Sequence, residues 1–102
     1  MIHVLATINL HPGKREAFLV EFRKVVPLVL QELGCMAYGP AIDAVTDVPA
    51  QGGRRPDTVV VVEQWSDLPA LKAHLVAPHM GPYRAAVKEL IASVSLQILA
   101  PA

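Results

Sequence analysis

Two histidines and a glutamate are the side chains whose types and spacing first suggest a reactive site. His74 and His79 lie in the segment His-Leu-Val-Ala-Pro-His, and Glu63 precedes them. Imidazole titrates near neutral pH, so His74 is the first candidate for a general base. A histidine at the edge of the core, bonded to a backbone carbonyl, explains His74 equally well. His79 directly follows Pro78, so it is a candidate either for a substrate contact or for the start of a helix.

The same three residues also match a metal site made of two histidines and one carboxylate. Pro78 interrupts the helical register between the histidines, so nothing in the sequence makes the two rings converge on one ion. Glu63 stands beside valines and needs a partner, and we expect an ion pair across a dimer rather than acid–base work. We therefore predict no metal ion at these residues.

Four further side chains are candidates for a substrate pocket. Trp65 shares a strand face with Glu63, because the two are two positions apart, and it either lines a pocket or fills the core. Tyr83 can donate its hydroxyl to a substrate oxygen, although its place in an apolar stripe with Met80 also suits packing. Asn9 points away from its apolar strand neighbours. The candidate substrate-binding residues are Trp65, Tyr83, Asn9, Met80, His79 and Glu63.

The composition argues against several classes of protein. The chain has 102 residues, enough for one domain over 1–102, and its 9 basic residues balance 9 acidic ones. Balanced charge gives no electrostatic reason to expect nucleic acid or a membrane surface as partner. Cys35 is the only cysteine, so no intrachain disulfide forms. The N-terminus has no basic secretory region, and no apolar stretch reaches the roughly 18 residues of a membrane span. We expect a cytoplasmic protein.

Hydrophobic periodicity predicts strands and helices in the order β-α-β-β-α-β. The expected strands are Ile2 to Leu10, Cys35 to Asp43, Thr58 to Trp65 and Val94 to Leu99. The expected helical segments are Lys14 to Leu33, Leu68 to Val76 and His79 to Ile91. Pro27 should kink the first helix without dividing it. The order predicts a ferredoxin-like α+β fold, with a four-stranded antiparallel sheet and helices on one face.

The apolar faces of these elements predict where they pack. Leu33 closes the stripe of the first helix, and Met36, Tyr38 and Ile42 share one face of the second strand. The loop over 43–57 is rich in glycine and proline, so it should be mobile.

The strands have apolar residues on both faces. Val59 and Val61 point to one face and Val60 and Val62 to the other, in a chain that is 53% hydrophobic with a mean hydropathy of +0.40. One helical layer covers only one face, and each apolar side chain left in water forfeits about 1.5–3 kcal/mol. We therefore predict a homodimer that closes through the uncovered face of the sheet.

Four short motifs occur in a fixed order along the chain. They are Pro12-Gly13-Lys14, Gly34-Cys35-Met36-Ala37-Tyr38, Glu63-Gln64-Trp65, and the segment from His74 to Met80. Together they resemble the antibiotic biosynthesis monooxygenase (ABM) family over nearly the whole chain. The loop over 43–57 is longer than the usual turn of that family. Haem-degrading relatives have a tryptophan at the position of His74 and a histidine at that of Arg84, so the resemblance argues against haem degradation.

The resemblance implies a dimeric α+β barrel that oxygenates quinols or anthrone-like aromatics without metal, flavin or any other cofactor. Such an enzyme needs an apolar cavity for a small aromatic ligand, a base, and donors for an oxyanion. In an enzyme of this kind, His74 is the expected catalytic base. Two alternatives remain: another enzyme on the same scaffold, such as an isomerase or lyase of a small metabolite, and a non-catalytic dimer that binds an apolar ligand.

Overall fold

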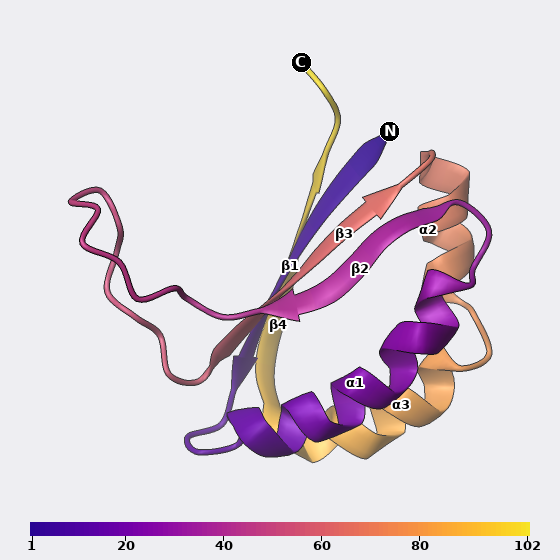
Figure 1. Cartoon of the computed structure of the whole chain (residues 1–102). Helices are drawn as coiled ribbons and strands as arrows, with labels where there is room; N and C mark the ends of the chain where they lie inside the picture. Colours follow the sequence, from indigo (N-terminus) through magenta and orange to yellow (C-terminus); the bar gives the residue numbers. More distant parts are fainter.

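A four-stranded antiparallel sheet organises the chain, and the computed structural model describes all of residues 1–102 (Figure 1). Its strands lie in the spatial order β2-β3-β1-β4. They are β1 (Ile2–Leu10), β2 (Cys35–Ala41), β3 (Thr58–Trp65) and β4 (Ile91–Leu99). The helices are α1 (Arg15–Leu30), α2 (Leu68–Leu75) and α3 (Met80–Val87), followed by the short 3₁₀ turn η1 (Lys88–Leu90). The predicted ferredoxin-like α+β fold is confirmed, and the bounds of β1 and β3 are those predicted.

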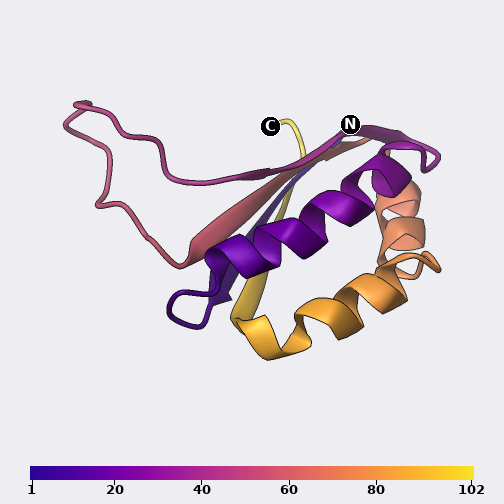
Figure 2. The same ribbon diagram turned by 60° about the horizontal axis from the view of Figure 1, so that its bottom comes forward.

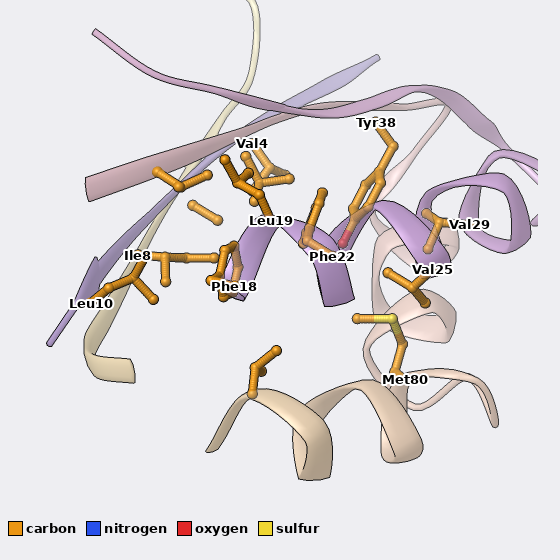
Figure 3. Close-up of a cluster of buried hydrophobic side chains, with 14 of the residues drawn as sticks. Val4, Ile8, Leu10, Phe18, Leu19, Phe22, Val25, Val29, Tyr38 and Met80 are labelled. Carbon is orange, nitrogen blue, oxygen red and sulfur yellow. The ribbon is translucent and has the colours of Figure 1, made fainter. Parts of the chain in front are cut away.

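The helices lie on one face of the sheet, as the rotated view shows (Figure 2). Alternation along β1 turns Val4, Ala6 and Ile8 toward them, where all three are buried. On α1, Phe18 and Phe22 recur one helical turn apart and pack against the sheet (Figure 3). An aromatic ladder extends this core, because the Phe22 ring stacks on Phe18 at 5.6 Å and on Tyr38 at 5.5 Å between ring centroids.

Helix α1 is shorter at its C-terminal end than the pattern predicts. It ends at Leu30, and Leu33 is 94% exposed instead of closing the apolar stripe. The chain turns early because Gly34 has φ of +81°, a left-handed conformation that ends a helix. Pro27 lies inside α1, which continues through it as one helix.

Of the three residues that were predicted to share one packed face of β2, only Tyr38 is buried. Met36 and Ile42, expected beside it, are both exposed. The pairing of β2 with β3 shifts register between Cys35 and Ala37, which takes Met36 out of the alternation, and the strand ends at Ala41. At the other edge of the sheet, β4 begins at Ile91 rather than Val94, because Ile91 already pairs with Leu10.

Two tight links place the helices around the site. The backbone N–H of Ser66 donates to the Gly34 carbonyl at 2.8 Å, which joins the α1–β2 link to the β3–α2 link. Asp67 then begins α2, because its side chain accepts a hydrogen bond from the Ala70 N–H at 2.9 Å.

The uncovered face of the sheet is apolar at its centre and polar along β4. Leu5 and Val62 pair there and are 39% and 43% exposed. The β4 residues on that face, by register, are Ser93, Ser95 and Gln97. The apolar side chains of β4, which are Val94, Leu96 and Ile98, lie on the helical side and remain exposed. The expectation of two apolar faces therefore holds for β3 but not for β4.

The loop from 43 to 57 projects from the sheet (Figure 1). An ion pair closes its base: the Arg55 guanidinium donates to both carboxylate oxygens of Asp43, at 2.8 and 2.9 Å, and the Arg55 N–H adds a third hydrogen bond. These bonds lower the pKa of Asp43 to about 2. None of the helices is both long and apolar enough to span a lipid bilayer.

Candidate active site

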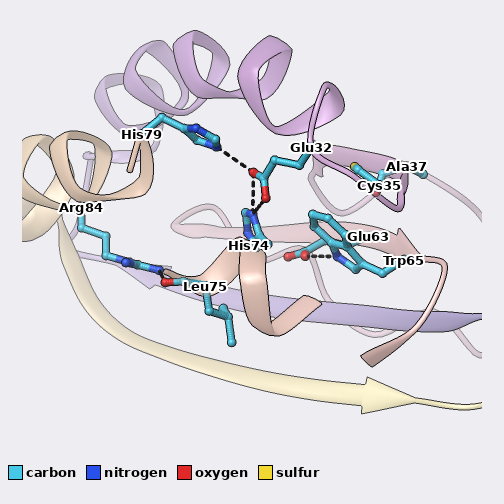
Figure 4. Close-up of polar contacts among 9 residues, drawn as sticks. All are labelled: Glu32, Cys35, Ala37, Glu63, Trp65, His74, Leu75, His79 and Arg84. Atoms are coloured by element: carbon cyan, nitrogen blue, oxygen red, sulfur yellow. Dashed lines mark hydrogen bonds and ion pairs between the residues drawn. The ribbon is translucent and has the colours of Figure 1, made fainter. Parts of the chain in front are cut away.

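A carboxylate that joins two histidines lies where the end of α1, helix α2 and the start of α3 meet (Figure 4). Glu32 follows α1, and its Oε2 lies 3.0 Å from Nδ1 of His74 and 2.7 Å from Nε2 of His79. Its Oε1 lies 3.2 Å from the same His74 nitrogen. The three side chains are buried to different extents: that of His74 is 3% exposed, that of Glu32 13% and that of His79 23%.

His74 lies deepest in this cluster, with aromatic rings against it. Helix α2 turns it and Leu71 toward the sheet, because the two residues are one helical turn apart. The imidazole centroid lies 4.8 Å from that of the Trp65 ring and 5.3 Å from that of Tyr38. Nδ1 is bonded to Glu32, whereas Nε2 has no hydrogen-bond partner. No fully buried polar side-chain atom of the protein lacks a partner, so Nε2 is not completely buried.

Glu63 and Trp65 form a second buried pair below the histidine. The indole N–H of Trp65 donates to Oε1 of Glu63 at 2.9 Å, and both side chains face the helices. Burial raises the pKa of Glu63, while the hydrogen bond from Trp65 and the charge of His74 oppose the rise. Our expectation that Glu63 pairs across a dimer is therefore wrong. Its face of the sheet is covered by the helices, and its partner is the indole two residues later.

The other predicted residues divide between a groove, the core and the far face. His79 and Tyr83 line a groove of about 190 Å³ between α1 and α3. Burial raises the pKa of the Tyr83 hydroxyl. Met80 is buried in the core. Asn9 lies on the opposite face of the sheet, where Thr58 donates to its carbonyl oxygen at 3.0 Å and its amide donates to Ser93 at 3.1 Å. The structure therefore does not bring Asn9 to the histidines.

Glu32 is the site residue that the sequence analysis missed. It lies in the link after α1, outside any apolar stripe, and 42 positions before His74. The one signal in the sequence was the pair of histidines on either side of Pro78. Buried imidazole N–H groups need hydrogen-bond acceptors, so the pair implies that an acceptor lies nearby. The set of two histidines and one carboxylate that was considered for a metal changes as well. The two rings converge, which the sequence around Pro78 gave no reason to expect, and they meet at the carboxylate of Glu32 and not at Glu63.

Comparison with known proteins places the chain in a family. The model of the family described as antibiotic biosynthesis monooxygenase matches residues 1–88. The chain belongs to that family. The Escherichia coli K12 protein "Probable quinol monooxygenase YgiN" is 42% identical to this ABM protein over 103 residues, covering 99% of this chain and 98% of the relative.

Solved structures of similar proteins agree with the ABM fold. PA3566 from Pseudomonas aeruginosa superposes with a TM-score of 0.79 at 26% identity, covering 99% of this chain and 93% of that one. Rv0793 from Mycobacterium tuberculosis gives a TM-score of 0.78, also at 26% identity, with coverage of 99% and 94%. This ABM protein therefore shares its sheet and helix arrangement with both of them over nearly their full lengths.

Proposed function

We propose that this protein is a cofactor-independent monooxygenase that oxidises a quinol or a related polycyclic phenol with O₂. Membership of the family and the 42% identity to a probable quinol monooxygenase support the reaction class. The observation that carries the site assignment is the state of His74. This imidazole is buried among aromatic rings, and it is bonded to a carboxylate through Nδ1 while Nε2 stays free.

The chemistry that we propose begins with proton removal. Nε2 of His74 takes a proton from a phenolic hydroxyl, and the resulting anion is electron-rich enough to reduce O₂. The imidazolium then returns its proton to the peroxide that forms on the ring. The O–O bond of this hydroperoxide then breaks: one oxygen atom stays on the ring carbon, and the other leaves as water with the hydrogen of that carbon as its second proton, so the substrate supplies all the electrons. Apolar and aromatic surroundings favour this sequence because they exclude competing water.

We further propose that the protein acts as a homodimer that closes through the uncovered sheet face. The exposed Leu5 and Val62 at the centre of that face support this arrangement. We propose a small aromatic ligand in the groove that Tyr83 and His79 line, with Trp65, which is fully buried against His74, supporting the base from the core. Met80 and Glu63 support this pocket from the core, and Asn9 is not included because it lies on the other face.

Oxygen uptake by the purified protein tests the proposal. Reduced naphthoquinol should be oxidised faster than it oxidises by itself, with no flavin, haem or metal added. His74→Ala should lower kcat by about 10²–10⁴-fold, the usual contribution of a general base. His11→Ala is the matched control, because His11 is an exposed histidine whose side chain makes no hydrogen bond, and it should keep the wild-type rate.

Two outcomes would contradict different parts of the proposal. Uptake that never exceeds autoxidation, across a panel of quinols and anthrones, would reject the reaction class. Real uptake that is unchanged in a folded His74→Ala variant would keep the reaction class and reject His74 as the base. Circular dichroism and sedimentation of each variant show whether the fold and the assembly are preserved.

A further inference from the structure

We propose that Glu32 is a positioning residue for this reaction, which holds His74 with its proton on Nδ1 and its lone pair on Nε2. The inference rests on the proposed function, because it assumes that His74 is the base. Neither the family match nor the sequence pattern points to Glu32. The geometry does, because a single carboxylate touches both histidines of the site at hydrogen-bonding distance.

The donor and acceptor roles follow from the chemistry of the carboxylate. An ionised carboxylate only accepts hydrogen bonds, so each imidazole nitrogen that faces it must carry a proton. At His74 the nitrogen that faces Glu32 is Nδ1, at 3.0 and 3.2 Å from the two oxygens. In a neutral imidazole the other nitrogen, Nε2, is then unprotonated. Glu32 therefore selects the tautomer in which the free nitrogen of His74 accepts a proton.

Glu32 is itself held at its backbone and at its carboxylate. Along the chain, the Glu32 N–H donates to the Val29 carbonyl at 2.9 Å, and its carbonyl accepts from the Cys35 N–H at 3.1 Å. On the solvent side, His79 donates to Oε2 at 2.7 Å from the start of α3. His79 thus anchors the carboxylate, and the carboxylate anchors His74. A fixed geometry of this kind is what a base needs, because small misplacements of reacting groups are costly.

Glu32 also compensates the charge that forms when His74 takes a proton. Proton uptake creates a buried imidazolium, which a carboxylate at hydrogen-bonding distance stabilises. Glu63 is the other carboxylate near His74, but its Oε1 is already engaged by the Trp65 indole. The two acids therefore have different tasks: Glu63 secures Trp65, and Glu32 orients His74.

The tautomer can be measured without any substrate. In ¹⁵N-labelled full-length protein at mildly alkaline pH, His74 should show a protonated Nδ1 and an unprotonated Nε2. Glu32→Gln keeps the size of the side chain, but its amide both donates and accepts, so the preference for the Nδ1–H form should be lost. Glu89→Gln, at an exposed carboxylate of η1, is the control and should leave the His74 resonances unchanged. A wild-type His74 with its proton on Nε2 would overturn the inference.

Kinetics of naphthoquinol oxidation then separate positioning from a structural role. Partners that orient a histidine contribute about 10–100-fold at metal sites, and we expect Glu32→Gln to lower kcat by the same order with KM nearly unchanged. In a His74→Ala background the same change should have almost no further effect, because Glu32 acts only through His74. Equal losses in both backgrounds would refute positioning. A wild-type protein with no activity would instead reject the proposed function, while the tautomer measurement would still decide the role of Glu32.

Discussion

Glu63 carries a buried charge that depends on pH. Its carboxylate has one hydrogen bond, from Trp65, and burial raises its pKa despite that bond. A carboxyl group with a raised pKa in the folded state binds a proton there more tightly than in the unfolded chain. Its contribution to stability is therefore complete at low pH and is lost as the pH rises through the folded pKa.

Glu63→Gln should remove this dependence. The amide keeps an oxygen for the indole N–H but never ionises, so the free energy of unfolding of the variant, relative to wild type, should rise as the pH passes from the ordinary glutamate pKa to the raised pKa of the folded protein and then level off. Urea unfolding of both proteins across that range is the measurement. A difference that falls with pH would mean that the folded protein stabilises the ionised carboxylate.

At the level of residues, the sequence predicted the histidines but not what connects them. His74, Trp65 and Tyr83 could be singled out because their types are rare in this chain and they stand in recognisable motifs. Glu32 could not, because its role depends on contacts between segments that are distant in sequence. Asn9 was misplaced for a related reason: alternation along β1 gave its face correctly, but not which face holds the site.

Among the elements, the two short links beside Gly34 control the geometry of the site. One link carries Glu32 and the other begins the helix that carries His74, and they meet where Ser66 donates to the Gly34 carbonyl. A Cβ atom at position 34 would lie 2.5 Å from Oγ of Ser66 and 2.7 Å from Cβ of Ala70. Glycine is required there both for its positive φ and for this close approach.

Gly34→Ala should therefore be more damaging than the same change at Gly13. Both glycines have positive φ, but nothing lies within 4 Å of a Cβ built at Gly13. Gly13→Ala should cost only the backbone penalty of about 1–2 kcal/mol. Gly34→Ala should cost about 1–3 kcal/mol more, because the new methyl group overpacks the contact between the links. Urea denaturation compares the two, and equal costs would show that the links separate without penalty.

The elements themselves were largely predictable, whereas their ends were not. The run of valines in β3 and the Pro-Gly stop after β1 are strong local signals, and both strands lie where they were expected. The end of α1 was predicted three residues too late. Leu33 continues the apolar spacing of the helix, but the turn at Gly34 overrides that spacing.

At the scale of the whole molecule, the uncovered sheet face tests the proposed dimer. Sedimentation at micromolar concentration should give about twice 11.0 kDa. Val62→Glu should convert the protein to a folded monomer, because a dimer would bury an unpaired carboxylate. Val20→Glu is the control: Val20 is a valine on the outer side of α1 that is at least as exposed as Val62, so the dimer should persist. A folded wild-type monomer would contradict the proposal.

The structure also shows which valine of β3 a test of the dimer should change. The sequence pattern puts Val60 and Val61 on opposite faces of the strand but does not tell which of the two faces the helices cover. Val61 is in fact part of the hydrophobic core under the helices, so a charge there would unfold the monomer itself. Only a charge on the uncovered face, for example at Val62, would disrupt the dimer without unfolding the monomer.

The ion pair at the base of the loop over 43–57 lets the length of the chain vary without disturbing the fold. Asp43 and Arg55 are held together where the loop leaves the sheet, so the segment between them is closed off from the pairing of β2 with β3. Lengthening a closed loop costs little, because its entropy changes only with the logarithm of its length. The tip near Gly52 is therefore a natural insertion point, where a peptide tag or an additional segment can be carried by the folded protein.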